Sequence, residues 1–304
     1  MGFAALFQAV AALVAPPAVP APPPEVARLT AREKAALVVV SGLPAPKGVA
    51  GVLVQGWSRS LPRPPKTLVF VDQEGGEASA FSQLPPGRTA SSFAGTREAF
   101  VTARVTGKAL RAAGVHIDLA PVLDLRDGPL GWRHFRRPAF ALAFARGLAA
   151  GGAGSCVKHF PGLGSAAVST DEAPHVRAVL RRTELRVFRH AVRAGVPCVM
   201  VGHAEYREFG RLRASFNRRA YRLLRRSGFA GVAITDSLSV FGSEWAVPAA
   251  RLAIRAGADL ILFTNGPDAG RAIEDILPVA RRGLLDERVA RVLQLLRSYG
   301  IRRH

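Results

Sequence analysis

The chain contains few cysteines and lysines, and it lacks the long apolar runs of a membrane protein. Of its 304 residues two are cysteines, and of its 42 basic residues five are lysines, at positions 34, 47, 66, 108 and 158. No internal stretch of about 18 or more apolar residues occurs, so we expect no internal membrane-spanning helix. A Walker A sequence and a G-x-G-x-x-G loop that opens a helix are missing, which disfavours a nucleotide-binding open sheet. The histidines lack a ligand spacing such as H-E-x-x-H, so we expect neither a metal nor an organic cofactor.

The formal charge of +20 comes mainly from arginine. Such a charge suits an acidic partner, either nucleic acid or an anionic cell-wall surface. However, the arginine excess accompanies abundant alanine, glycine and proline, a composition typical of a coding bias, so the charge is expected to be spread over the whole surface. In addition, no run of basic residues is interleaved with aromatic residues. We therefore expect no specific nucleic-acid site, while a loose association with an anionic cell wall stays open. The pattern carries no signal for an oligomeric state.

The N-terminal residues 1–27 form an apolar stretch followed by a tract of proline and alanine. This order resembles a secretory signal with a small-residue cleavage zone near Ala15–Ala21. We expect an extracytoplasmic or secreted protein, with a cytoplasmic one as the alternative because no basic residues precede the apolar stretch. No linker-like stretch follows residue 30, so residues 28–304 are predicted to form one domain.

Short apolar runs alternate with amphipathic stretches along this domain, which predicts parallel β/α units. Strands are predicted at Gly51–Val54, Thr67–Asp72, Val115–Ala120, Gly154–His159, Pro197–His203, Gly231–Asp236 and Ala258–Phe263, with an eighth at Ala36–Val40. Helical periodicity occurs at Arg97–Ala113, Pro138–Ala150, Glu184–Ala194, Asn217–Ser227, Ala246–Ala256, Asp268–Arg281 and Asp286–Ser298, and Thr30 is a plausible N-cap of an earlier helix. This number of strands and this length predict an α/β fold with a single (β/α)8 TIM-type barrel.

The two cysteines lie in predicted strands, in which side chains alternate between the two faces. Cys156 has the same parity as Lys158, whereas Cys198 has the parity opposite to that of His203. If Lys158 and His203 both face the barrel axis, the two sulfur atoms face different sides. The alternation thus predicts two buried free thiols and no disulfide.

Polar side chains gather where the predicted strands end. They are Asp72, Asp118, Asp124, Lys158, His159, His203 and Asp236. A polar group inside an apolar strand costs free energy unless it is satisfied, and barrel enzymes keep their chemistry at the carboxyl ends of the strands. The pattern therefore predicts a ligand-binding or active site at this end of the barrel.

Several of these residues belong to longer motifs that follow one another in a fixed order. The motifs are VDQEGG at 71–76, LAPVLDL at 119–125, LGWRHF at 130–135, KHFPGLG at 158–164 and TDSLSV at 235–240, with weaker echoes in ELRVF at 184–188, VMVGH at 199–203 and ASFN at 214–217. Over roughly residues 28–297 this set resembles glycoside hydrolase family 3. The branch that it resembles most is that of the bacterial β-N-acetylglucosaminidases that trim peptidoglycan fragments.

The resemblance implies roles for individual residues. Asp236 takes the position of the nucleophile that forms a glycosyl-enzyme intermediate, and the alternative reading is a helix N-cap. The sugar-binding positions fall on Asp72, Arg133, Lys158 and His159, to which we add His203. The alternatives are a hydrogen-bonded core histidine for His159 and a surface salt bridge for Arg133.

Three departures from the family pattern concern catalysis and substrate binding. Leu163 replaces the second histidine of KHFPGHG, and Ala80 replaces an arginine that grips the substrate. In the loop that follows, the family branch supplies its general acid/base from an Asp-x-His dyad, which here becomes Ser169 and Asp171.

We expect Asp171 to act as the general acid/base, with Glu172 and His175 as the other candidates on the same loop. A loop without any catalyst is the remaining alternative. The leading hypothesis is a retaining β-glycosidase, similar to a β-N-acetylhexosaminidase, that acts on the amino sugars of cell-wall fragments. The alternatives are a catalytically impaired sugar-binding barrel and a family 3 β-glycosidase of different sugar specificity.

Overall fold

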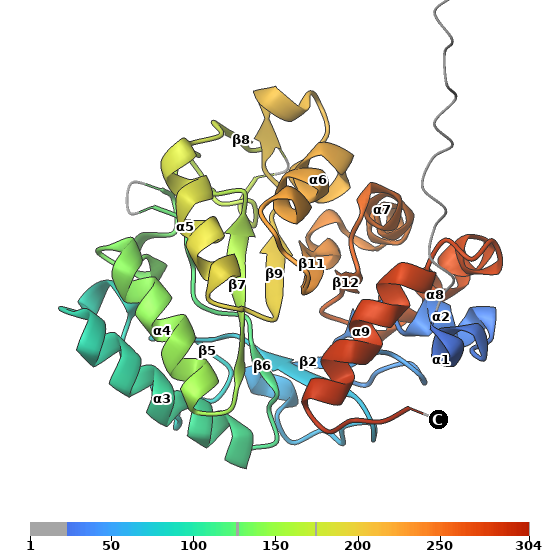
Figure 1. Cartoon of the computed structure of the whole chain (residues 1–304), viewed down its shortest axis with the longest axis horizontal. Helices are drawn as coiled ribbons and strands as arrows, with labels where there is room; N and C mark the ends of the chain where they lie inside the picture. Colours follow the sequence, from blue (N-terminus) through green and yellow to red (C-terminus); the bar gives the residue numbers. More distant parts are fainter. Residues whose placement is uncertain (1–22, 126–127, 174, 304) are drawn as a thin grey trace, which may run out of the picture.

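The computed structural model describes residues 23–125, 128–173 and 175–303, and they form a closed parallel barrel (Figure 1). The strands around the barrel are, in order, β1 (Val39–Ser41), β12 (Leu260–Leu262), β11 (Val232–Ser237), β9 (Cys198–Val201), β7 (Gly154–Phe160), β6 (Ile117–Asp118), β3 (Leu68–Val71) and β2 (Gly51–Val54). All neighbouring pairs are parallel. The predicted (β/α)8 barrel is therefore confirmed.

Helices surround the barrel in the order that the sequence periodicity predicts (Figure 1). They are α1 (Pro24–Ala27), α2 (Ala31–Ala36), α3 (Thr96–Ala112), α4 (Pro138–Ala150), α5 (Arg182–Arg193), α6 (Arg218–Arg226), α7 (Ser243–Ala256), α8 (Gly266–Arg281) and α9 (Asp286–Ser298). The Thr30 side chain accepts a hydrogen bond from Glu33 N–H, and the Glu33 carboxylate accepts from Thr30 N–H, so a capping box starts α2 as predicted.

Several short elements were not predicted, because two or three residues are too few to carry a period. Two small sheets pair β4 (Gln73–Gly75) with β5 (Ala78–Ser79) and β8 (Arg177–Ala178) with β10 (Glu205–Tyr206). Single 3-10 turns occur at η1 (Gly56–Ser58), η2 (Ala90–Ser92), η3 (Gly131–Arg133), η4 (Arg207–Phe209), η5 (Ala214–Phe216) and η6 (Leu238–Phe241). Most of these elements lie in loops that follow barrel strands, so they shape the end at which the site lies.

The barrel strands are buried almost throughout, which explains their continuous apolar runs. Within the described ranges, no helix is both long and apolar enough to span a membrane. The predicted cleavage zone Ala15–Ala21 lies outside the described residues, and the division at residue 27 stays a prediction.

The prediction for the two cysteines is wrong, because Cys156 and Cys198 form a disulfide. They are direct partners on β7 and β9, with Cα atoms 4.3 Å apart. Two features of the structure explain why the prediction from strand alternation fails. The register between β7 and β9 shifts between Val157 and Phe160, and β9 ends at Val201, so the alternation does not extend to His203.

Candidate active site

The predicted site residues meet at one mouth of the barrel, because the carboxyl ends of parallel strands lie at the same rim. Asp72 follows β3 and Asp124 follows β6, whereas Lys158 and His159 lie on β7. His203 follows β9, and Asp236 lies near the end of β11. In Figure 1 the segment with β8 lies beyond the arrowhead of β7, so it overhangs this mouth.

Glu74 is the centre of a buried ion-pair network at the mouth. Its carboxylate accepts two hydrogen bonds from the Arg133 guanidinium, each of 2.8 Å, and lies 2.7 Å from Lys158 Nζ. Lys158 Nζ also donates to Asp72 Oδ1 at 2.6 Å. Glu74 and Lys158 are almost fully buried, whereas Asp72 is partly open to solvent. The network therefore fixes Lys158 and Arg133 while one carboxylate stays accessible.

The charges in this network shift each other's pKa values. Burial alone would raise the pKa of Glu74, but Lys158 and Arg133 outweigh it and lower that pKa to about 2. Burial alone would lower the pKa of Lys158, but Asp72 and Glu74 outweigh it and raise that pKa above its usual value. Each group is thus held in its charged form.

Asp124 holds the segment that carries His159. Its buried carboxylate accepts hydrogen bonds from the ring Nδ1 of His159 at 2.7 Å and from Leu163 N–H at 2.7 Å. The backbone N–H of His159 donates to the same carboxylate at 3.2 Å. With Nδ1 bound to Asp124, the Nε2 nitrogen remains for other partners.

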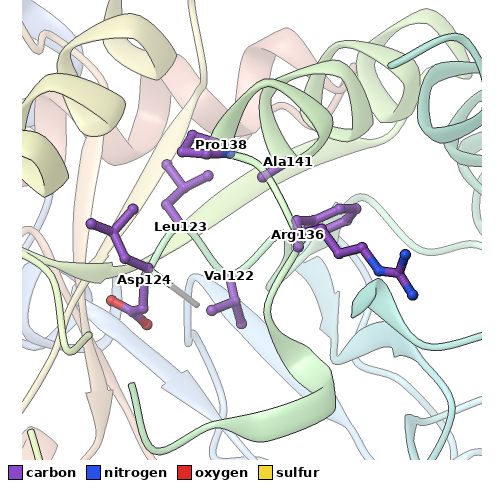
Figure 2. A pocket seen from close by; sticks show the side chains of 8 residues that line it. Val122, Leu123, Asp124, Arg136, Pro138 and Ala141 are labelled. Carbon is purple, nitrogen blue, oxygen red and sulfur yellow. The ribbon is translucent and has the colours of Figure 1, made fainter. Parts of the chain in front are cut away.

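Asp124 also borders a cavity of about 410 Å³ behind the mouth, between the segment 122–125 and the first turns of α4 (Figure 2). Figure 2 shows Leu123 beside Pro138, and it shows the Arg136 side chain directed away from Asp124. The described lining is mostly apolar and contains a single carboxylate, that of Asp124. The described lining of this cavity therefore supplies no candidate for a catalytic carboxylate other than Asp124.

Asp236 is half-buried and interacts electrostatically with two histidines and a lysine. Burial alone would raise its pKa, but His159, His203, the backbone N–H of Ser237 and Lys158 outweigh it and lower the pKa. The Ser237 N–H lies 2.8 Å from Asp236 Oδ1. Asp236 is therefore ionised at neutral pH.

His203 is buried and hydrogen-bonded through both ring nitrogens. Its Nε2 lies 3.0 Å from the carbonyl oxygen of Ser237, and its Nδ1 lies 2.7 Å from Ser215 Oγ. Only a donor can bond a carbonyl oxygen, so Nε2 carries the proton. Burial lowers the pKa of His203, so the neutral ring accepts at Nδ1 from the serine hydroxyl.

Asp171 lies on the loop between β7 and α5, at the rim of the mouth. Ser165 and Val179 bridge the base of this loop, where Val179 N–H donates to Ser165 Oγ at 2.6 Å. Glu205 N–H on β10 donates to Val176 O at 2.8 Å, which fixes the loop's second half. Asp171 is open to solvent at the rim, yet the surrounding protein raises its pKa and the charge of Asp236 raises it further, against His159, Arg133 and Lys158.

The two other acid/base candidates, Glu172 and His175, lie on the same loop and are exposed like Asp171. His175 Nδ1 lies 2.9 Å from Glu205 Oε1. At the positions of the other departures, Ala80 is buried, as is Leu163. Ala80 N–H donates to the carbonyl oxygen of Asp72 at 2.8 Å. The structure therefore places Asp171 at the charged mouth. The buried Ala80 contributes no polar side chain to it.

Sequence reasoning missed three buried carboxylates: Glu74, Asp124 as a partner of His159, and Glu184. Glu74 stands in the VDQEGG motif two residues after Asp72, so its signal was present. Glu184 accepts from Gly164 N–H at 2.8 Å and from Leu125 N–H at 3.3 Å. Burial and then the charge of Asp124 raise the pKa of Glu184 to about 7. Through its two hydrogen bonds, Glu184 holds the loop that follows Lys158 and His159.

A parallel barrel with two unlike carboxylates and fixed cations at one mouth is typical of barrel glycoside hydrolases. Residues 57–295 match the Glycosyl hydrolase family 3 N terminal domain. The chain belongs to glycosyl hydrolase family 3.

Several relatives are similar to this chain. The beta-hexosaminidase of Neisseria meningitidis serogroup C is 32% identical over 234 residues, which are 68% of this chain and 65% of that protein. The beta-hexosaminidase of Alkalilimnicola ehrlichii is 33% identical over 270 residues, 79% of this chain and 75% of that protein. The structure of a family 3 beta-N-acetylglucosaminidase from Paenibacillus sp. has a TM-score of 0.78 at 25% identity, covering 90% of this chain and 63% of that one. The chain thus spans just under two thirds of the first and third of these relatives.

We expect Glu74→Gln to lower the free energy of unfolding by about 3–5 kcal/mol at pH 7, because it leaves two buried cations with one partly exposed carboxylate. The folded pKa of Glu74 lies near 2, below its ordinary value of 4.5. Its contribution is therefore present above about pH 4.5 and is lost as the pH falls towards 2. Urea unfolding between pH 2 and 7 measures both effects.

Glu274→Gln is the matched control, because Glu274 forms an exposed ion pair with Arg32. Its unfolding free energy should equal that of the wild type within error. A Glu74→Gln protein as stable as this control at pH 7 would contradict the assignment of Glu74 as the centre of the network.

Proposed function

We propose that the protein is a retaining β-glycosidase that cleaves β-linked N-acetylhexosamines. The observation that carries the proposal is the pairing, at one barrel mouth, of an ionised strand-end carboxylate, Asp236, with a rim carboxylate, Asp171, of raised pKa. Retaining glycosidases use such a pair, one as nucleophile and one as acid and base. The family membership and the names of the beta-hexosaminidase relatives support the choice of sugar.

In the first step a carboxylate oxygen of Asp236 attacks the anomeric carbon while the bond from that carbon to the leaving oxygen breaks. Asp171 gives its proton to the leaving oxygen, so the aglycone departs as a neutral alcohol. In the second step a water molecule attacks the anomeric carbon, Asp171 takes the water proton, and the bond to Asp236 breaks. The sugar leaves with a free hydroxyl, and both carboxylates return to their starting forms.

The remaining site residues suit the binding of the sugar hydroxyls. The accessible carboxylate of Asp72 accepts hydrogen bonds, and Lys158 and Arg133 donate them. The ring of His159 is oriented by Asp124, and His203 holds the backbone at Ser237, next to the nucleophile. These roles give the charged network a catalytic purpose.

The natural substrates that we propose are amino sugars of cell-wall fragments, and the site of action is outside the cytoplasm. The apolar N-terminal stretch supports export, and so does the disulfide between Cys156 and Cys198, because disulfides persist in oxidising compartments. The net positive charge suits a loose association with an anionic wall.

A screen of aryl β-glycosides with purified protein tests the proposal. We expect the aryl N-acetyl-β-glucosaminide to be the fastest substrate, ahead of the β-glucoside, β-galactoside and β-xyloside. A faster glucoside would assign the protein to family 3 β-glycosidases of another specificity. Absence of turnover on every β-glycoside would favour a sugar-binding barrel, for which the loss of the family dyad at Ser169 and Asp171 is the motivating observation.

Asp236→Ala should reduce turnover of the aryl glycoside to the uncatalysed rate, because no nucleophile remains to form the covalent intermediate. A 2-fluoro glycoside should label the wild-type protein with one sugar, which peptide mass spectrometry should locate on Asp236. A label on any other carboxylate would refute the nucleophile assignment.

Asp171→Ala should slow the hydrolysis of a natural disaccharide by about 10²–10⁴-fold, because a sugar alkoxide needs a proton to depart. The first step with an activated aryl glycoside should change much less, since its leaving group needs little protonation. Azide should then restore the second step by replacing base-activated water. The steady-state and pre-steady-state rates of both substrates measure these effects.

Glu172→Ala is the neighbouring control, and it should leave both substrates within about threefold of the wild type. Disaccharide turnover within about threefold of the wild type in Asp171→Ala, well below the usual range for acid catalysis, would remove Asp171 as the acid/base. The same measurement on Glu172 and His175 variants would then identify it.

A further inference from the structure

A groove of about 710 Å³ runs from Asp171 along the outside of the barrel mouth. Six of its sixteen lining residues are polar, and they lie on the loops after β7 and β9 or, for His203, at the end of β9. The opposite wall is apolar, and its main side chains are Leu212, Phe216, Phe241, Trp245 and Leu252. The volume suits a small-molecule site, for which 300–1,000 Å³ is usual.

The apolar wall comes largely from a second apolar face of α7. Trp245, Ala249 and Leu252 recur at helical spacing and line the groove. Ala246, Ala250 and Ala253 are buried on the face that packs against the barrel. Trp245 is 70% exposed and Leu252 is 50% exposed. A surface helix normally keeps polar residues on its outer face, so an apolar outer face next to a catalytic mouth indicates binding.

A chain of ring contacts connects this wall with the catalytic mouth. The Phe241 ring lies 4.7 Å from the ring of His203 and 5.6 Å from that of Phe216, measured between centroids. The Arg213 guanidinium lies over the same Phe241 ring, 4.8 Å from its centroid. The groove therefore begins at His203 and Asp171 and continues without a break onto apolar surface.

We propose that this groove binds the aglycone and favours aglycones that place an apolar part against the wall formed by η6 and α7. The inference rests on the proposed function, in which Asp171 protonates the leaving oxygen. A proton donor must lie within hydrogen-bond reach of that oxygen, so the group beyond the oxygen enters the space that Asp171 borders. Among the groove-lining residues of η6 and α7, only Trp245 carries a side-chain donor, its indole N–H, so this wall favours apolar groups over hydroxyl groups.

Butyl and octyl N-acetyl-β-glucosaminides test the inference, because their leaving alcohols have nearly equal acidity and differ only in apolar length. Complete burial of one methylene is worth roughly a fourfold gain in affinity, and an open groove about half-buries it, for about a twofold gain. Four added methylenes should then raise kcat/KM by about 16-fold. The measurement uses the octyl compound below its critical micelle concentration.

Trp245→Ala and Leu252→Ala should each lower the octyl-to-butyl ratio towards one, by about threefold or more. Leu284→Ala is the matched control, since Leu284 is an equally exposed leucine outside the groove. It should keep the wild-type ratio.

Three results would overturn the inference. They are an octyl-to-butyl ratio near one in the wild type, a preference for a β-linked N-acetylglucosamine disaccharide that Trp245→Ala abolishes, and a dimer in light scattering that Trp245→Ala dissociates. The second result would make the groove a sugar subsite, and the third would make it a subunit interface. Calorimetric binding of the two alkyl glycosides needs no turnover, so a length effect on binding without hydrolysis would support the groove while refuting the glycosidase proposal.

Discussion

The barrel mouth depends on the burial of Glu74 between Lys158 and Arg133. Three separate segments supply these groups: the short strand β4, the turn η3 and the barrel strand β7. A buried charge without a partner is costly, so each segment can reach its place only when the other two are present. The network thus couples the positions of these three segments. Asp72 nevertheless remains accessible beside Lys158.

Unequal surroundings at the mouth separate the pKa values of the two proposed catalytic carboxylates. Interactions with His159, His203, the Ser237 N–H and Lys158 lower the pKa of Asp236 despite its burial. The surrounding protein and then the charge of Asp236 raise the pKa of Asp171, against His159, Arg133 and Lys158. The pKa values of two carboxylates of the same intrinsic acidity therefore shift in opposite directions, as a nucleophile and a general acid require.

The barrel and most of the mouth could be predicted from the sequence because strands buried on both faces leave continuous apolar runs, and polar residues such as Lys158 and Asp236 mark where the runs end. Glu74 could not be recognised as the centre of the network, since its partners lie 59 and 84 residues away in sequence. The disulfide was missed because strand parity is a local rule. A register shift next to Val157 is set by the neighbouring strand and has no local sequence signature.

The positions of the two carboxylates also explain why the groove opens on one side. Asp236 is part of a barrel strand and cannot move without the core, whereas Asp171 lies on an overhanging loop that β8 and β10 fasten at its far end. In the proposed mechanism, a sugar held over Asp236 points its leaving oxygen outward, towards the loop. The space beyond that oxygen is bounded by the Asp171 loop on one side and by α7 on the other. Sequence change on the outer face of α7 can therefore alter which aglycone is accepted, while the network around Glu74 and the nucleophile stays as it is.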